Sequence, residues 1–161
     1  MTRRRPPTDP TLRAARLTLL TTSAITLGFQ SIISSVVYPQ LFDGTSHGIA
    51  ERQADHARRI APVALTLYSS TLGAAAWATY GSLTSGERSG RLATAVACAS
   101  GIAGPLVTAG VLPLHAGIAQ EQITRPRIAA LMASDRLRTG LAAVGVVAAA
   151  GDSTRLWSAW I

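Results

Sequence analysis

The chain alternates long apolar stretches with shorter polar ones, and three of the apolar stretches have the length of membrane-spanning helices. An α-helix needs about 20 consecutive apolar residues to cross the hydrocarbon core of a bilayer. Three stretches of this length lie at residues 17–38, 60–80 and 92–114. None of them contains Asp, Glu, Lys or Arg, so we predict a transmembrane helix over each.

A fourth span is less regular, because its apolar run, residues 141–150, is too short to cross a bilayer. It reaches across only when the helix is extended back to residue 128. This extension draws Asp135, Arg136 and Arg138 towards the bilayer, where ionisable residues usually face the interior of a bundle or a water-filled cavity. With this last helix, the sequence predicts an all-α integral membrane four-helix bundle.

The predicted bundle covers residues 17–150 and is flanked by two tails. Residues 1–16 form a basic, proline-broken tail, and the apolar stretch behind it is too long for a cleavable signal peptide, so we expect a retained signal anchor. Residues 151–161 form a C-terminal tail in which Trp157 and Trp160 suit the membrane interface.

Two of the predicted loops, residues 40–59 and 115–130, are long and charged and lie on the same side of the bilayer. The N-terminus, the short turn at 81–91 and the C-terminal tail hold eight arginines, and the two long loops with the start of the fourth helix hold seven. Because basic residues favour the cytoplasmic side, this small excess predicts that both termini are cytoplasmic.

The composition agrees with a membrane protein. Of the 161 residues, 48% are hydrophobic and only 14% are charged. All fifteen basic residues are arginines, and their dispersal gives no stripe of the kind that binds nucleic acid. The single cysteine, Cys98, excludes an internal disulfide. The expected partners are membrane lipids and a lipophilic small molecule, and self-association into a homo-oligomer stays open.

Polar and small residues fall on one predicted side of each of the first three spans. In the first span these are Ser23, Gln30, Ser31, Ser34 and Tyr38. In the second they are Pro62, Thr66, Ser69, Ser70, Gly73, Trp77 and Tyr80, and in the third Ala97, Gly101, Gly104, Thr108 and His115. Such stripes serve helix packing in many membrane proteins, so they predict an inward face more firmly than a binding site.

Two histidines are placed to face the bundle. If residues 47–59 are helical, His47 lies on a charged, solvated side and His56 lies on the opposite side, at the mouth of the second span. His115 ends the third span on the face of Thr108. Titratable groups in a cleft are candidates for catalysis, although a histidine at headgroup level is equally compatible with this position of His115.

On the fourth helix, Asp135 and Thr139 interrupt an otherwise apolar side, and Arg138 follows Asp135 by one turn. Ionisable residues inside a membrane mark functional sites more often than not. The alternative is an ion pair between residues i and i+3 that only orders the start of the helix.

Three segments resemble the small four-helix membrane proteins related to anthrone oxygenase. They are GFQSIISSVVYPQL in the first span, GVLPLHAGIA at the end of the third and ASDRLRTGLAAVGVVAA at the start of the fourth. The resemblance covers the whole predicted bundle and is most specific at Pro113 with His115 and at Arg138 with Thr139. Typical members carry asparagine in place of His115, and a tryptophan and a histidine where this chain has residues 133–136.

The resemblance implies a membrane-embedded enzyme that oxygenates a lipophilic, aromatic or polycyclic carbon acid, with dioxygen as co-substrate and no cofactor or metal. This chemistry needs a base for the C–H proton and a cation or hydrogen-bond donor for the enolate. The catalytic candidates are His115, His56, Asp135 and Arg138. A histidine is the base, Asp135 orients it, and Arg138 holds the oxyanion with Gln30. The predicted substrate-binding residues are Gln30, Tyr38, Trp77, Thr108 and Thr139.

Other functions remain open at this point. The same groups suit epoxide opening or cyclisation. A metal site would use His56 and His115 with Asp135 or Glu121, although no local ligand spacing supports one. A non-catalytic membrane subunit would use its charged loops to dock a partner. A carrier is less compatible with a single small bundle. An internal pocket would distinguish an enzyme from a scaffold.

Overall fold

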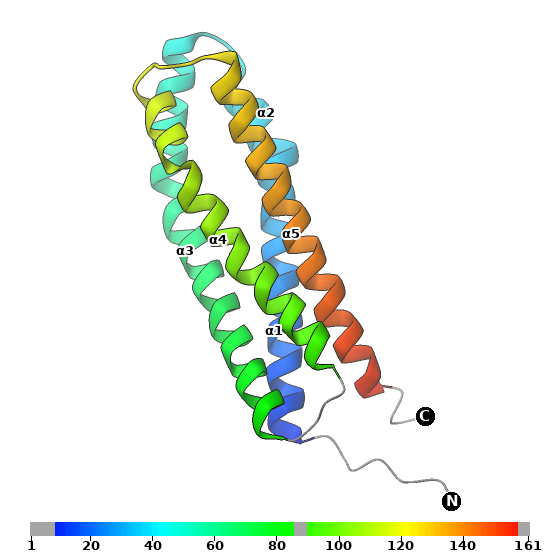
Figure 1. Ribbon diagram of the computed structural model, residues 1–161. Coiled ribbons are helices and arrows are strands. Elements are labelled where there is room, and N and C mark those ends of the chain that lie inside the picture. The colour runs from blue at the N-terminus through cyan, green and yellow to red at the C-terminus, as the bar shows by residue number, and fades with distance from the viewer. Residues whose placement is uncertain (1–8, 86–89, 158–161) are drawn as a thin grey trace, which may run out of the picture.

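Helices account for almost all of the chain in the computed structural model, which describes residues 9–85 and 90–157 (Figure 1). Four long helical rods make up this part of the chain, and no strand occurs in it. The first rod consists of α1 Pro10–Ile32, the π-helical turn η1 Ile33–Val37 and α2 Tyr38–Leu41. The other three are α3 Ser46–Thr84, α4 Arg91–Ala119 and α5 Arg125–Trp157. The predicted all-α fold is therefore confirmed.

The four rods form an antiparallel bundle in which each rod packs against two neighbours. α1 packs on α3 and α5, and α4 packs on the same two helices from the other side, so α1 and α4 lie on a diagonal. α1 begins and α5 ends at the same end of the bundle (Figure 1). The two charged segments around 40–59 and 115–130 share the opposite end of the bundle, and His47 pairs there with Glu121 at 3.0 Å.

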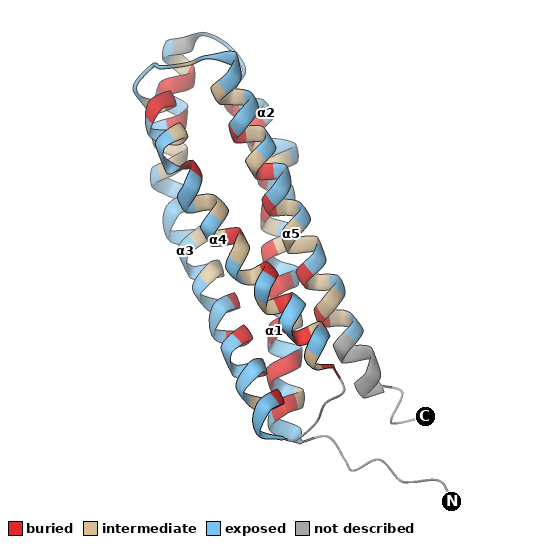
Figure 2. Ribbon diagram, in the orientation of Figure 1, coloured by how far each residue is buried: buried red, intermediate tan, exposed pale blue. Residues whose placement is uncertain are grey.

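The apolar core is divided into two clusters. At the end where α1 begins, small residues let the helices approach closely. This cluster contains Ala15, Leu19, Ala74, Ala75, Ala78, Ala97 and Ala149. At the opposite end, larger side chains fill the interior, and these are Ile33, Tyr38, Leu41, Ile49, Val111, Ile118 and Leu131. Buried residues follow the facing sides of the rods along the bundle (Figure 2), and buried polar residues, among them Thr26, Gln30 and Thr71, lie between the two clusters.

The outer surface is apolar along much of the bundle. Leu65, Leu92 and Val147 are each more than two-thirds exposed. By length and composition, three helices are able to cross a membrane, namely 10–41, 47–84 and 91–119. Among the described residues, α5 does not meet that description, in keeping with the charged residues in its first half.

The helices begin earlier and end later than the apolar stretches predicted. α1 begins at Pro10, where the side chain of Asp9 accepts a hydrogen bond from the backbone N–H of Thr11 at 2.9 Å and caps the helix. Leu12 and Arg16 are buried. The predicted tail of residues 1–16 is therefore wrong from Pro10 onwards, and its first eight residues lie outside the described part.

The two long loops are also mostly helical. α3 begins at Ser46 and α4 runs on to Ala119, so only residues 42–45 and 120–124 connect the helices at this end. The charges that indicated loops lie on exposed helix faces, as Arg58 and Arg59 show by pairing with Asp55 at 2.7 Å.

The C-terminal tail differs from its prediction in the same way. α5 continues to Trp157, so residues 151–157 extend the last helix. The predicted interfacial position of Trp157 and Trp160 lies outside the described side chains.

Candidate functional site

An ion pair lies in the interior of the bundle. Asp135 and Arg138 stand one turn apart on α5, with 3.1 Å between Arg138 Nη2 and Asp135 Oδ1. Asp135 is 1% exposed and Arg138 is 6% exposed. Removing two charges from water is costly unless further hydrogen bonds satisfy them, so the surroundings of the pair decide whether it is stable.

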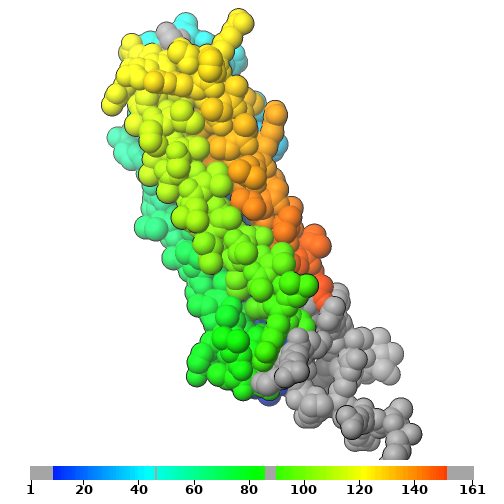
Figure 3. All heavy atoms as spheres, in the orientation of Figure 1, coloured from blue at the N-terminus to red at the C-terminus, as the bar shows by residue number. Residues whose placement is uncertain are grey.

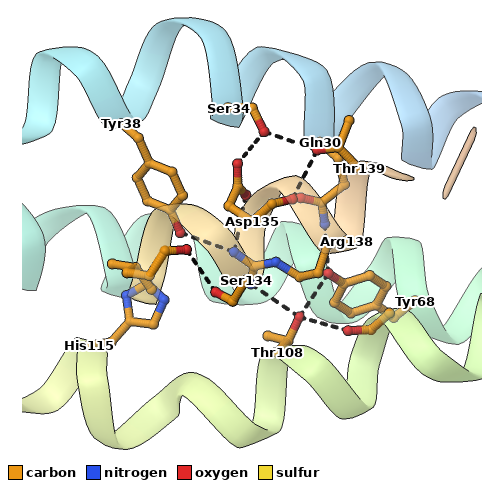
Figure 4. A network of polar contacts seen from close by, with 12 residues as sticks. Gln30, Ser34, Tyr38, Tyr68, Thr108, His115, Ser134, Asp135, Arg138 and Thr139 are labelled. Carbon is orange, nitrogen blue, oxygen red and sulfur yellow. Dashed lines mark hydrogen bonds and ion pairs between the residues drawn. The ribbon is translucent and has the colours of Figure 1, made fainter. Parts of the chain in front are cut away.

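The first rod supplies partners to both charges (Figure 4). Ser34 donates to the second carboxylate oxygen of Asp135 and lies 2.9 Å from the hydroxyl of Thr139. Arg138 Nη2 donates to the phenol oxygen of Tyr38 at 3.2 Å. Both residues of the ion pair are therefore bound to the first rod as well as to each other.

The other nitrogen of Arg138 extends the network to α3 and α4. Nη1 donates to Thr108 at 3.3 Å, and Thr108 lies 3.0 Å from the hydroxyl of Tyr68. Gln30 completes the network from α1 by donating to the Tyr68 oxygen at 2.7 Å. Hydrogen bonds thus connect all four rods around one guanidinium (Figure 4).

A π-helical turn in the first rod places its contributions. The backbone N–H of Tyr38 donates to the carbonyl of Ile33, five residues earlier. In a regular α-helix, residues five apart point about 140° apart, because each residue advances by about 100°. In the wider turn, Ile33 and Tyr38 are both buried, and Ser34 reaches Asp135. π-helical turns occur often at functional sites.

The two candidate histidines lie at the end of this network that is nearer the α4–α5 connection. The ring of His56 packs against the ring of Tyr38, with 6.1 Å between centroids. His115 is hydrogen-bonded through Nδ1 to the side chain of Gln53, and it lies close enough to Arg138 and His56 to interact with their charges. Tyr38 therefore connects the histidine pair to the buried ion pair.

Two hollows adjoin the network. An internal cavity of about 30 Å³, enough for a water molecule, is lined by polar groups that include Ser23, Gln30, Tyr68, Thr71, Ser100 and Arg138. An open groove of about 750 Å³ lies between the end of the first rod and α3. Its lining is mostly polar and charged and consists of Val37, Gln40, Leu41, Glu51, Arg52, Ala54, Asp55, His56, Arg58 and Arg59. Side chains of α4 and α5 close the face of the bundle seen in Figure 3.

The structure brings most of the predicted site residues together. The network contains Asp135, Arg138, Gln30, Tyr38, Thr108 and Thr139, and His56 packs against Tyr38. His115 is bonded to Gln53 and lies beside the network (Figure 4). Trp77 does not, because its side chain is 41% exposed on the outside of α3. Its predicted part in substrate binding has no support in this geometry.

The predicted inward stripe of α3 is wrong. Its hydroxyl residues face outwards, and two of them donate to a backbone carbonyl one turn earlier, Thr66 to Pro62 at 2.9 Å and Ser69 to Leu65 at 2.8 Å. The inward polar residues of α3 are instead Gln53, Tyr68, Thr71 and Ser82. The helical spacing of the buried residues Ala74, Ala75 and Ala78 is the sequence pattern that indicates this inward face.

The alternative metal set is not assembled. Glu121 pairs with His47 rather than with His56 or His115. Within the described part of the chain, no three His, Cys, Asp or Glu side chains come together in a way that could hold a metal ion.

The fold and site define an all-helical bundle with a charged, hydrogen-bonded interior and three helices of membrane-spanning length. No family model, no curated protein and no solved structure matches the chain. The likeness to proteins related to anthrone oxygenase therefore stays an expectation from its sequence motifs.

Proposed function

We propose that the protein is an integral membrane enzyme that acts on a lipophilic small molecule with a carbonyl or phenol oxygen beside an acidic C–H bond. The observation that carries the proposal is the buried pair of Asp135 and Arg138, which Tyr38 joins to His56 at an open groove. Titratable groups with unusual surroundings beside a cleft are the usual equipment of acid–base catalysis.

The apolar outer surface supports membrane insertion. Large apolar side chains are exposed along all four rods, among them Ile32, Leu65, Leu106 and Val147. A soluble monomer rarely exposes so much contiguous apolar surface, whereas lipid covers it without cost. We propose that all four rods cross the bilayer, with both termini on the cytoplasmic side and the groove towards the opposite side.

The groove supplies a place for the substrate ring system. Val37 offers apolar contact there, His56 offers a base beside it, and the charged residues of the lining face the polar end of the substrate. Behind His56, Arg138 donates to the Tyr38 oxygen, so the Tyr38 hydroxyl keeps its own proton for donation. A fixed donor backed by a cation stabilises negative charge that develops on the substrate oxygen. Asp135 holds the guanidinium in place.

The resemblance to anthrone oxygenase-related proteins supplies a specific reaction. A base removes one proton from a CH₂ group beside the conjugated system, and the resulting carbanion gives electrons to dioxygen. One oxygen atom remains on the carbon as a ketone, and the other leaves as water with the two hydrogens of that carbon. Epoxide opening and cyclisation are the alternatives that the same residues would support.

A second candidate is a non-catalytic membrane subunit, and the size of the internal cavity favours it. About 30 Å³ is far below the roughly 300–1,000 Å³ of pockets that enclose a small molecule. In this alternative, the network only fixes the four rods relative to one another, and the groove holds lipid.

Co-purification distinguishes the two candidates. We would purify the protein in mild detergent and identify bound small molecules by mass spectrometry, comparing the wild type with His56→Ala and His115→Ala. His47→Ala is the matched control, because His47 is exposed and pairs only with Glu121. The enzyme proposal predicts a specific lipophilic compound that is lost in the first two variants and kept in the control. Bulk lipid alone in all four samples would favour the subunit.

A further inference from the structure

A fully buried amide contacts one of the two candidate histidines. Gln53 on α3 is 0% exposed and lies on the same buried side of the helix as Ile49. Its side-chain nitrogen Nε2 is hydrogen-bonded to Nδ1 of His115 on α4. The side-chain oxygen of Gln53 is buried and has no hydrogen-bond partner among the described residues. A buried glutamine in this position is therefore held chiefly by the histidine.

The chemistry of the two groups fixes the position of a proton. An amide nitrogen only donates, so Nδ1 of His115 accepts with its lone pair. A neutral imidazole carries one N–H, which must then be on Nε2. Turning the amide round would bury an amino group without an acceptor in place of one carbonyl oxygen. Unpaired buried N–H groups are rarer than under-satisfied carbonyls, which favours the observed orientation.

We infer that Gln53 is a positioning residue that holds His115 in the Nε2–H form, so that His115 donates a hydrogen bond and His56 is left as the base. The assignment of the two roles rests on the proposed function, whereas the proton position does not. Within the described part of the chain, neither ring nitrogen of His56 has a hydrogen-bond partner, so its lone pair is free to accept a proton.

The proposed reaction needs one histidine to accept a proton and the other to donate a hydrogen bond. His56 packs against Tyr38, which accepts a hydrogen bond from the buried cation Arg138, and His115 lies near both Arg138 and His56. An enzyme that forms an enolate needs one group to take a proton and others to donate to the oxygen, a task that His115 shares with Tyr38. Two neighbouring imidazoles of the same type separate these tasks only if something fixes their tautomers, and Gln53 does so for His115.

Nuclear magnetic resonance of ¹⁵N-labelled histidine measures the tautomers without any substrate. The full chain contains three histidines, and His47→Ala, His56→Ala and His115→Ala assign their signals. We expect wild-type His115 to carry its proton on Nε2. In Gln53→Glu the carboxylate only accepts, so the proton of His115 should move to Nδ1. In Gln53→Leu the hydrogen bond is lost, and both tautomers should be populated.

Gln120→Glu is the matched control, because Gln120 is exposed and close to His115 in sequence, and the change adds the same charge. It should leave the His115 tautomer unchanged. The inference is overturned if wild-type His115 carries its proton on Nδ1, or if Gln53→Glu folds and leaves the tautomer as in the wild type. If Gln53→Glu fails to fold, Gln53→Leu with the same signals as the wild type overturns it. If no compound co-purifies but the tautomers are as expected, the result contradicts the proposed function and leaves the role of Gln53 intact.

Discussion

Removing the guanidinium of Arg138 should destabilise the bundle strongly. In Arg138→Met, Asp135 stays 1% exposed but loses its cation, and it keeps only the hydrogen bond from Ser34. Breaking a buried ion pair by deleting one partner costs about 3–5 kcal/mol, because an uncompensated charge remains. We expect a loss of about 3 kcal/mol or more, which lowers the folding equilibrium constant by more than about a hundredfold.

The assay is reversible unfolding in detergent, followed by circular dichroism. Arg136→Met is the control, because it removes an arginine from the exposed side of the same helix and should change stability little. The double variant Asp135→Asn with Arg138→Met has no uncompensated charge and should recover most of the loss. A loss below about 1 kcal/mol for Arg138→Met would be typical of an exposed pair and would refute this reasoning.

Three further predictions test the network, the packing and the topology. Tyr68→Phe leaves buried Gln30 without its acceptor and should cost about 1–3 kcal/mol, whereas Tyr80→Phe, at an exposed position, should cost nothing measurable in the same unfolding assay. Ala78→Leu overpacks the small-residue cluster and should cost about 1–3 kcal/mol, whereas Ala76→Leu on the exposed side should be tolerated. A fluorescent protein fused to the C-terminus should fluoresce, because that end is expected in the cytoplasm; a dark fusion that is otherwise expressed would reverse the orientation.

The all-helical bundle could be predicted from the sequence, because apolar stretches of membrane-spanning length are compatible with few folds other than packed helices. The site followed from the cost of burying charge: Asp135 and Arg138 interrupt an apolar helix, and the structure places them in the interior. The helix ends did not follow, because charges on an exposed helix face look the same in sequence as charges in a loop. Asp55 and Arg59 are an example.

The inward face of α3 was misread for a different reason. Hydroxyl residues such as Thr66 bond to their own helix, so their polarity does not require an inward position. A constant period of 3.6 residues also does not predict the π-helical turn at Ile33–Val37. Ser34 and Tyr38 were expected on the inward side, but their particular contacts with the ion pair depend on that turn.

Photo-crosslinking at the groove tests the central claim most directly. A photoreactive amino acid at Val37 lies in the groove beside His56. The same amino acid at Leu65, a residue that is 71% exposed, lies on the outer surface. After irradiation in membranes, mass spectrometry identifies what each position has captured. We predict one specific lipophilic compound at Val37 and ordinary membrane lipid at Leu65. The same lipids at both positions would contradict a substrate site in the groove.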